Sequence, residues 1–201
     1  MTRIKICGLR RPGDIEIVNK YKPDFAGFII DFPKSHRSIT GEEAGNLRRI
    51  LSPEIAAVGV FVDQPADKVI GLLKDGVIDI AQLHGRENDD YIRRVQEESG
   101  KPVIKAFEVK NKEDIETALS SPADYLLLDK GKGGGETFDW SLIGKDMDRA
   151  WFLAGGLDPF NLKEAIDRLH PWGLDISSGV ETNGVKDQAK IAEVMRIIKR
   201  S

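Results

Sequence analysis

Short apolar runs recur along this chain at intervals of roughly 20 to 30 residues, and this spacing constrains the fold more than any other feature. Each run has the length and the β-branched content of a strand. Each interval has room for a strand, a loop, a helix and a second loop. The runs are IKIC near residue 5, FAGFII near 27, AAVGVF near 58, DIAQLHG near 82, PVIKAF near 104, YLLLD near 127, WFLAGG near 153 and GLDISSG near 176.

Polar segments with a helical pattern separate these runs, at 41–51, 65–74, 88–99, 112–119 and 159–169. Pro12 and Pro65 stand where the first turn of a helix tolerates proline, and Asn88 is a typical residue at a helix start. Strands that alternate with helices in this way favour parallel βαβ units. Eight units predict an α/β fold, a (β/α)8 TIM barrel, as a single domain over residues 1–201. An open, doubly wound sheet is the alternative.

The composition excludes several classes of protein. With 30 Lys and Arg against 33 Asp and Glu, the formal net charge is −3, which argues against binding to nucleic acid or anionic membranes. No apolar run approaches the roughly 20 residues that a membrane helix needs, and no apolar signal segment follows Met1. One cysteine cannot form an intrachain disulfide, which favours the cytoplasm. One cysteine and three histidines offer no zinc-binding spacing, so we expect no metal.

In a barrel of this kind the active site lies at the carboxyl ends of the strands, so inward-facing residues there are candidates for function. Side chains two residues apart on a strand share a face. This alternation directs polar side chains inward: Arg3, Lys5 and Cys7 on the first strand, Gln82 and His84 on the fourth, Lys105 on the fifth, Asp129 on the sixth, and Asp175 and Ser177 on the eighth. Buried charges need partners. Lys5, Lys105 and Asp175 therefore also fit a purely structural ion network.

The last two expected strands end in glycine-containing turns, AGG at 154–156 and SSG at 177–179. Glycine lets backbone N–H groups approach a ligand closely, and exposed amides near a helix start attract anions. The loops after strands seven and eight form the recurring phosphate site of such barrels. We therefore expect Gly155, Gly156, Ser178 and Gly179 to hold the phosphate of a small metabolite. Tight turns without a ligand are the alternative.

A thiol and a carboxyl, Cys7 and Asp129, end the first and sixth expected strands. A phosphate-anchored substrate between them would meet one group that removes a proton and one that donates a proton, the minimum for an isomerase. The thiol, with an ordinary pKa of about 8.5, needs positive charge nearby to act as a base, and Lys5 or Arg37 can supply it. Asp129 needs the opposite effect, desolvation, to keep its proton.

The densest glycine cluster of the chain, KGKGGGET at 130–137, directly follows the sixth expected strand. Its position and composition predict a mobile loop over the active site. Lys130 and Lys132 in this loop would oppose protonation of Asp129 if they pointed inward.

The ordered set of motifs resembles the phosphoribosylanthranilate isomerase family of tryptophan biosynthesis, almost from end to end. The order of the motifs makes the resemblance specific, because each motif alone is weak. The motifs are KICGL at 5–9, GFII at 27–30, KSHRSI at 34–39, VGVFVD at 58–63, QLHG at 82–85, LLLD at 126–129, GGGETFDW at 133–140, FLAGGLDPFNL at 152–162 and LDISSGVETNGVKD at 174–187.

This resemblance implies an Amadori rearrangement of N-(5-phosphoribosyl)anthranilate to 1-(2-carboxyphenylamino)-1-deoxyribulose 5-phosphate. In family terms, Asp129 is the general acid that protonates the ribose ring oxygen, and Cys7 is the general base that removes the C2′ proton. Arg37 matches the group that holds the anthranilate carboxylate, for which a guanidinium fork is suited. The other matches are Gly156, Ser178 and Gly179 in the phosphate turns, and Gln82, His84 and Asp175 as residues that line the pocket.

The resemblance implies no cofactor, because the anthranilate nitrogen supplies the electrons for ring opening. The expected partner is a small phosphorylated substrate, without nucleic acid or membrane, and the expected protein is a cytoplasmic monomer or homodimer. Two features depart from the family pattern. Arg10 stands where many relatives carry Thr or Ser, and the 130–137 segment is unusually rich in lysine and glycine. Neither departure removes a residue assigned to the chemistry.

Other functions remain open at this point. Another phosphate-binding barrel enzyme, such as a ribulose-phosphate epimerase or an indoleglycerol-phosphate synthase, would share the glycine turns. An epimerase would be expected to bring metal ligands, and a synthase a set of lysine and glutamate residues on early strands. Lys5 and Lys105 agree in part with a synthase, but no glutamate accompanies them at a strand end. A catalytically silent binding protein would need the turns without Cys7 and Asp129.

Overall fold

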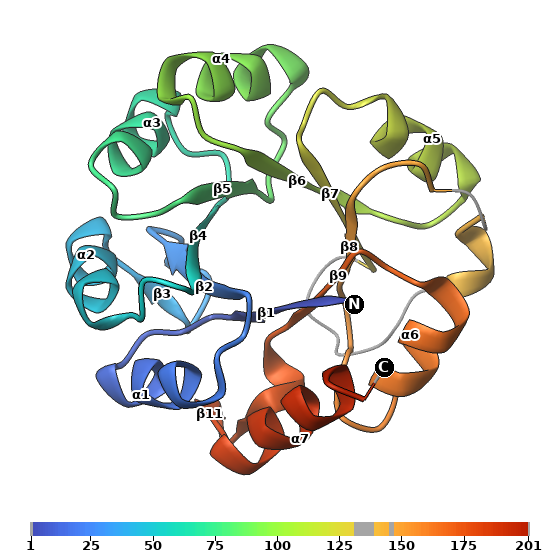
Figure 1. The fold of residues 1–201 in the computed structure, drawn as a ribbon. Coiled ribbons are helices and arrows are strands. Elements are labelled where there is room, and N and C mark those ends of the chain that lie inside the picture. Colours follow the sequence, from blue (N-terminus) through green and yellow to red (C-terminus); the bar gives the residue numbers. More distant parts are fainter. Residues whose placement is uncertain (1, 131–138, 145–146, 201) are drawn as a thin grey trace.

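The computed structural model describes residues 2–130, 139–144 and 147–200. Within these residues, eight parallel strands form a barrel in the order β1-β9-β8-β7-β6-β5-β4-β2, and pairing of β2 with β1 closes it (Figure 1). The predicted (β/α)8 barrel is confirmed, because an open sheet would leave β1 and β2 unpaired with each other. The strands are β1 (Arg3–Cys7), β2 (Phe25–Ile30), β4 (Ala56–Phe61), β5 (Ile80–Leu83), β6 (Val103–Glu108), β7 (Tyr125–Asp129), β8 (Trp151–Leu153) and β9 (Gly173–Ile176).

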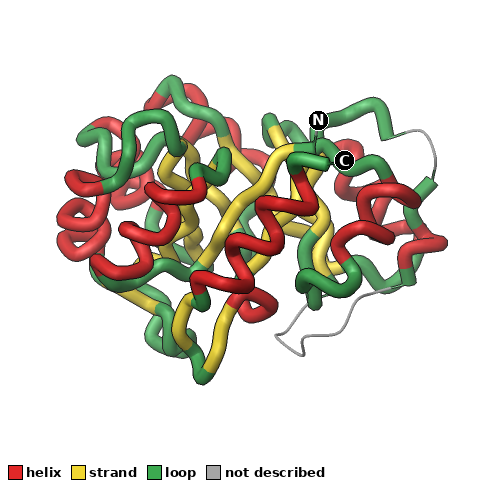
Figure 2. The backbone as a smooth tube through the Cα atoms, turned by 60° about the horizontal axis from the view of Figure 1, so that its bottom comes forward, coloured by secondary structure: helices red, strands yellow, loops and turns green. Residues whose placement is uncertain are grey.

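Helices surround the strands on the outside of the barrel (Figure 2). In the described part of the chain these are α1 (Pro12–Tyr21), α2 (Gly41–Ile50), α3 (Ala66–Lys74), α4 (Asp89–Ser99), α5 (Lys112–Ser120), α6 (Leu162–Leu169) and α7 (Gln188–Ile198). Pro12 is the first residue of α1, and the side chain of Asn88 accepts a hydrogen bond from the Tyr91 N–H at the start of α4. Both helix starts agree with the sequence-based expectation. None of the described helices is long and apolar enough to span a membrane.

Helix α6 begins three residues later than position 159, where the sequence pattern placed its start. The Asp158 carboxylate accepts hydrogen bonds from the N–H groups of Phe160 and Asn161, at 2.8 and 3.1 Å. These bonds hold residues 158–161 in a turn instead of a first helical turn. The turn follows directly on the glycine pair after β8.

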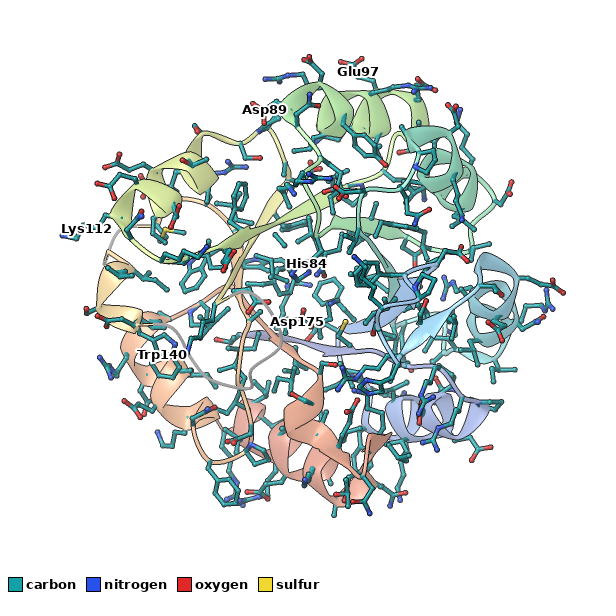
Figure 3. All side chains as sticks on the ribbon, turned by 180° about the vertical axis from the view of Figure 1, so that it is seen from behind. His84, Asp89, Glu97, Lys112, Trp140 and Asp175 are labelled. Atoms are coloured by element: carbon teal, nitrogen blue, oxygen red, sulfur yellow. The ribbon has the colours of Figure 1, made fainter. Side chains whose placement is uncertain are left out.

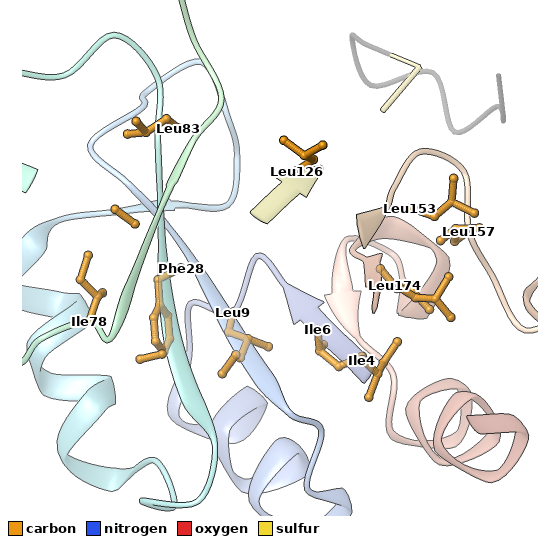
Figure 4. Close-up of a cluster of buried hydrophobic side chains, with 14 of the residues drawn as sticks. Ile4, Ile6, Leu9, Phe28, Ile78, Leu83, Leu126, Leu153, Leu157 and Leu174 are labelled. Atoms are coloured by element: carbon orange, nitrogen blue, oxygen red, sulfur yellow. The ribbon is translucent and has the colours of Figure 1, made fainter. Parts of the chain in front are cut away.

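Apolar side chains form two layers, one on each face of the barrel wall. The outer layer lies between the strands and the helices and includes Ile4, Ile6, Phe28, Leu83, Leu126, Leu153 and Leu174 (Figure 4). The inner layer fills the barrel itself, with Phe25, Val58, Ile80, Ile104, Ala106, Leu127, Phe152 and Ala154. Because Ile4 and Ile6 belong to the outer layer, Lys5 and Cys7 face the interior, as predicted.

Aromatic side chains close the amino-terminal end of the barrel. The rings of Phe25 and Phe152 lie 5.5 Å apart, and the Trp172 ring lies 4.8 Å from Tyr125 and 5.2 Å from Phe152. The guanidinium of Arg3 sits 4.9 Å above the Trp172 ring, which is a cation–π contact. We call these four rings the aromatic floor. This end is therefore filled by packed rings, and Arg3 is the inward-face polar residue of β1 that lies there, while Cys7 and Asp129 lie at the carboxyl ends of their strands.

Several short elements were not predicted from the sequence. Strand β3 (Ser38–Ile39) pairs with β2, and η2 (Ser178–Val180) is a 3-10 turn after β9. Strands β10 (Glu181–Thr182) and β11 (Val185–Lys186) form an antiparallel hairpin. The 3-10 helix η1 (Trp140–Leu142) lies between β7 and β8. The loop predicted to be mobile at 130–137 lies outside the described residues from position 131 onward.

Candidate active site

Two glycines make room for the side chains around Cys7. A Cβ atom on Gly27, the neighbour of Cys7 across β1 and β2, would lie 2.8 Å from the Cys7 sulfur. Gly8 has a φ of +79°, and a Cβ there would lie 2.5 Å from Cδ of Arg37. A larger residue at either position would displace the thiol or the guanidinium. The Cys7-Gly8 pair therefore places both groups in one corner of the barrel mouth.

Lys5 and Asp175 form a buried ion pair beneath this corner. They are register partners on β1 and β9, and Lys5 Nζ donates to both carboxylate oxygens of Asp175 at 2.9 Å. Burial lowers the pKa of Lys5, but the negative charge of Asp175 and the interaction with Cys7 outweigh it, so the pKa is raised. Lys5 therefore keeps its charge inside the barrel. The ion network considered from the sequence is present for these two residues.

The Cys7 thiol is 6% exposed, and its pKa is raised above the usual value. Burial is the main cause, because it disfavours the thiolate. The charge of Lys5 acts in the opposite direction, as does that of Lys186, but neither cancels the effect of burial. Lys5 thus acts on the thiol as the sequence suggested, without making it more acidic than a free cysteine.

Arg37 is engaged by a carboxylate. Its Nε and Nη2 donate to the two oxygens of Glu181, each at 2.7 Å. Lys186 donates to the same carboxylate at 2.7 Å. Burial raises the pKa of Glu181, but the hydrogen bonds from Arg37 and Lys186 prevail and lower it to about 2. Burial lowers the pKa of Lys186. Glu181 therefore stays ionised and fixes one edge of the Arg37 guanidinium.

Sequence reasoning missed Glu181 and Lys186 as parts of this site. They are register partners on the β10–β11 hairpin, whose turn residues Asn183 and Gly184 have φ values of +53° and +72°. An Asn-Gly pair between short strand-forming segments is a recognised hairpin signature, so the sequence ETNGVK contained this information. The Arg10 side chain donates to the carbonyl of Gly184 at 3.4 Å. The unusual Arg10 thus links the loop after β1 to the hairpin.

Asp129 lies at the other side of the barrel mouth, at the end of β7, with His84 and Gln82 beside it. His84 Nε2 is 3.6 Å from Oδ2 of Asp129, and Nδ1 of the same ring is 3.2 Å from Nε2 of Gln82. A Cβ atom on Gly155 would lie 2.7 Å from Oδ1 of Asp129. The turn after β8 therefore packs directly on the Asp129 carboxyl.

The two glycine turns predicted to hold phosphate lie against each other. A Cβ atom on Gly179 would lie 2.0 Å from the carbonyl oxygen of Leu157, so only glycine allows this approach. Gly155 and Gly156 both have positive φ, and Asn161 fixes the turn through a 2.7 Å hydrogen bond to the Gly156 carbonyl. Within the described ranges, the N–H groups of Gly155 and Gly156 donate to no backbone or side-chain acceptor. These groups are available to an anion.

Lys105 does not face the barrel interior, contrary to the expectation from the sequence. Its neighbours Ile104 and Ala106 belong to the inner apolar layer, so Lys105 points to the outer face. Its Nζ donates to the carbonyl of Gly85 at 2.7 Å and to the carboxylate of Glu87 at 3.1 Å. Glu87 comes from the loop after β5 and not from a strand end. This buried pair braces a loop.

No three His, Cys, Asp or Glu side chains among the described residues are grouped so as to hold a metal ion. The polar groups of the site include one thiol, an imidazole, an amide, a guanidinium and backbone amides, together with three carboxyls (Asp129, Asp175 and Glu181) and the ammonium groups of Lys5 and Lys186. The inward side chains of β1, β5, β7 and β9 meet above the inner apolar layer, where Figure 3 shows His84 and Asp175 near the middle of the ring. Fold and site together define a (β/α)8-barrel enzyme.

Comparison with known proteins identifies the family. The model of the N-(5′-phosphoribosyl)anthranilate (PRA) isomerase family matches residues 4–196. The chain is 45% identical over 204 residues to the N-(5′-phosphoribosyl)anthranilate isomerase of Endomicrobium trichonymphae, with 99% of each chain covered. It is 40% identical to that of Acetivibrio thermocellus, over 100% of this chain and 97% of the relative. The chain therefore belongs to the PRA isomerase family, which confirms the resemblance seen in its motifs.

Solved structures agree with this assignment. The crystal structure of phosphoribosylanthranilate isomerase from Thermotoga maritima superposes with a TM-score of 0.89 at 37% identity, over the whole of both chains. A crystal structure of a phosphoribosylanthranilate isomerase in complex with reduced 1-(o-carboxyphenylamino)-1-deoxyribulose 5-phosphate gives a TM-score of 0.88 at 36% identity, again over both whole chains.

Proposed function

We propose that this chain isomerises N-(5-phosphoribosyl)anthranilate to 1-(2-carboxyphenylamino)-1-deoxyribulose 5-phosphate, an aldose–ketose rearrangement in tryptophan biosynthesis. The observation that carries the proposal is the order of strands around the barrel. Cys7 ends β1 and Asp129 ends β7, while β8 and β9, which carry the glycine turns, lie between them. A phosphate held at these turns brings the attached ribose between the thiol and the carboxyl.

The first chemical step assigned to this site opens the ribose ring. The Asp129 carboxyl donates its proton to the ring oxygen as the bond between C1′ and that oxygen breaks. The lone pair of the anthranilate nitrogen forms a double bond to C1′ in the same step, which gives a protonated Schiff base. Asp129 is left as a carboxylate next to His84.

The second step moves a proton from carbon. Cys7, as the thiolate, removes the C2′ proton, and the electron pair of that bond forms a C1′–C2′ double bond while the nitrogen regains its lone pair. The resulting enolamine tautomerises to the C2′ ketone. The Lys5 ammonium beneath the thiol favours its deprotonated form during this step.

Arg37 is proposed to hold the anthranilate carboxylate. A guanidinium has five N–H donors in a rigid plane, and Glu181 occupies the edge formed by Nε and Nη2. The edge formed by Nη1 and the second Nη2 hydrogen remains for a planar carboxylate. Glu181 thus supports the proposed role of Arg37, because it orients the fork before substrate binds.

The remaining assignments follow the same pattern. Gly155, Gly156, Ser178 and Gly179 bind the phosphate, and Gln82, His84 and Asp175 line the pocket. The proposed enzyme is a single catalytic domain over residues 1–201 that needs no cofactor and acts in the cytoplasm. It is a monomer or a homodimer, and a solved structure of monomers of the dimeric Thermotoga maritima relative supports considering both states.

The test supplies freshly made N-(5-phosphoribosyl)anthranilate and follows the loss of its anthranilate fluorescence, without added metal or nucleotide. We expect wild-type protein to consume the substrate, and Cys7→Ala and Asp129→Asn each to lose nearly all turnover. Arg37→Ala should mainly raise KM, because it removes a binding contact. Failure of the wild-type protein to turn over the substrate would overturn the function. Full activity of either Cys7→Ala or Asp129→Asn would overturn that residue's role.

A further inference from the structure

We propose that Gln82 is a positioning residue, which fixes the proton of His84 on Nε2 so that this N–H faces the Asp129 carboxyl. The catalytic consequence rests on the proposed function, because it concerns the general acid. The hydrogen-bond arrangement itself is a property of the free protein and can be measured without turnover.

The three side chains form a row at the barrel mouth. The Gln82 amide nitrogen lies 3.2 Å from His84 Nδ1, and His84 Nε2 lies 3.6 Å from Oδ2 of Asp129. The second distance is longer than a direct hydrogen bond, as is common for catalytic contacts before substrate binds. His84 therefore stands between a buried amide and the proposed acid.

The chemistry of the two end groups selects one form of the ring. The NH2 group of Gln82, a hydrogen-bond donor, faces Nδ1, so in a neutral imidazole Nδ1 carries the lone pair and Nε2 carries the hydrogen, which can be donated to the carbonyl oxygen of the Asp129 acid. A neutral imidazole with hydrogen on Nε2 has a lone pair on Nδ1, which needs a donor. The NH2 group of Gln82 is that donor.

Stability alone does not explain a glutamine at position 82. Gln82 is 1% exposed, and its Oε1 has no hydrogen-bond partner among the described residues. A buried polar atom without a partner costs stability. The inward neighbour on the same strand, Ile80, is apolar, so an apolar side chain would continue the inner layer at no such cost. The contact that the amide does make is the one to His84.

The experiment compares two substitutions of similar size. Gln82→Glu replaces the donor with an acceptor, and Gln82→Met removes hydrogen bonding altogether. In 15N-histidine spectra of the free wild-type protein, assigned with His84→Asn, we expect the Nε2–H tautomer of His84. Gln82→Glu should place a proton on Nδ1 and lower kcat on the order of tenfold with little change in KM. Gln82→Met should unfold at the same or a higher temperature than wild type.

A double substitution separates positioning from packing. In the His84→Asn background, Gln82→Glu should cause no further loss of kcat, because the ring through which it acts is absent. Additive losses would overturn the proposal, as would the Nδ1–H tautomer in wild-type protein. A lower unfolding temperature of Gln82→Met with an unchanged tautomer would assign Gln82 to packing and also overturn it. If wild-type protein lacks isomerase activity, the spectra still decide the positioning claim.

Discussion

Glycine residues set the space around both proposed catalytic side chains. Gly27 adjoins the Cys7 sulfur and Gly155 adjoins the Asp129 carboxyl, each within 3 Å of where a Cβ atom would stand. The positions of the proposed acid and base thus depend on the absence of a Cβ atom at these two glycines. Substitution of either glycine by alanine, which adds one methyl group, therefore tests the geometry of the site.

Gly155→Ala tests this dependence at Asp129. The added methyl would meet the Asp129 oxygen at 2.7 Å, and alanine is strained at the φ of +85°. We expect kcat/KM to fall on the order of tenfold or more, because the acid is displaced from its working geometry. Gly76→Ala is the matched control, since Gly76 has a φ of +68° and nothing within 4 Å of its Cβ position. Equal activity of the two variants would contradict the prediction.

The buried thiol predicts an alkaline titration. Burial raises the pKa of Cys7. When the thiolate absorbance at 240 nm is followed against pH, we therefore expect the midpoint of the titration to lie above pH 8.5, about the usual pKa of a cysteine. Cys7 is the single cysteine of the chain, so Cys7→Ala supplies the baseline. Lys186→Met should shift the titration further upward, because the Lys186 charge lowers this pKa. If the thiolate absorbance were already complete at neutral pH, the prediction of a raised Cys7 pKa would be refuted.

At the scale of elements, the β10–β11 hairpin brings Glu181 to Arg37 and Lys186. The pKa of Glu181 is lowered from 4.5 to about 2 in the folded protein. A lowered carboxyl pKa stabilises the folded state above the unfolded value, and this contribution is lost as the pH falls from about 4.5 towards 2. The hairpin therefore carries an acid-sensitive part of the stability.

Glu181→Gln should remove this contribution. We expect the variant to be less stable than wild type at pH 6, and the difference to shrink below pH 4.5, as measured by urea unfolding at both pH values. Glu193→Gln is the control, because Glu193 pairs with Arg196 on the exposed surface of α7, where ion pairs contribute little. A difference that stays constant across this pH range would count against the ionic role of Glu181.

The sequence predicts the regular elements well, and the reason is their length. All eight barrel strands lie at the predicted apolar runs, because strand and helix periodicities persist over enough residues to be recognised. The strands β3, β10 and β11 have two residues each and show no periodicity. For the β10–β11 hairpin the available signal was the Asn183-Gly184 pair, and because this pair was not used, Glu181 was missed as the partner of Arg37.

Which face of a strand points inward was predictable only where the two faces differ. On β1, apolar Ile4 and Ile6 alternate with Lys5 and Cys7, and the predicted inward face is confirmed. On β6, both faces are largely apolar, because parallel strands in a barrel are buried on both sides. The inward assignment of Lys105 was therefore wrong. Its orientation depends on the ion pair with Glu87, which lies eighteen residues away in the chain.

At the scale of the whole molecule, the two ends of the barrel have different tasks. The residues proposed for the chemistry lie at the carboxyl ends of the strands, whereas the aromatic floor at the other end stabilises the barrel through ring–ring contacts. Changes at the floor should therefore affect stability without affecting the site.

Trp172→Ala tests this division. Loss of the ring contacts with Tyr125 and Phe152 should lower the free energy of unfolding by about 3 kcal/mol, while KM at permissive temperature stays unchanged. Phe160→Ala is the control for stability, because its ring is 96% exposed and its loss should leave the unfolding free energy nearly unaltered. A raised KM in Trp172→Ala would show that the two ends are not independent.

The Lys5–Asp175 pair joins residues 170 positions apart, on the first barrel strand and the last. Ribosomal synthesis at about 5 to 20 residues per second separates their emergence by roughly 10 to 30 seconds. Throughout that interval the nascent sheet has an open seam, and the Lys5 ammonium must remain hydrated. The growing polypeptide thus cannot close its barrel until Asp175 has been synthesised, which makes closure a long-range event in its biogenesis.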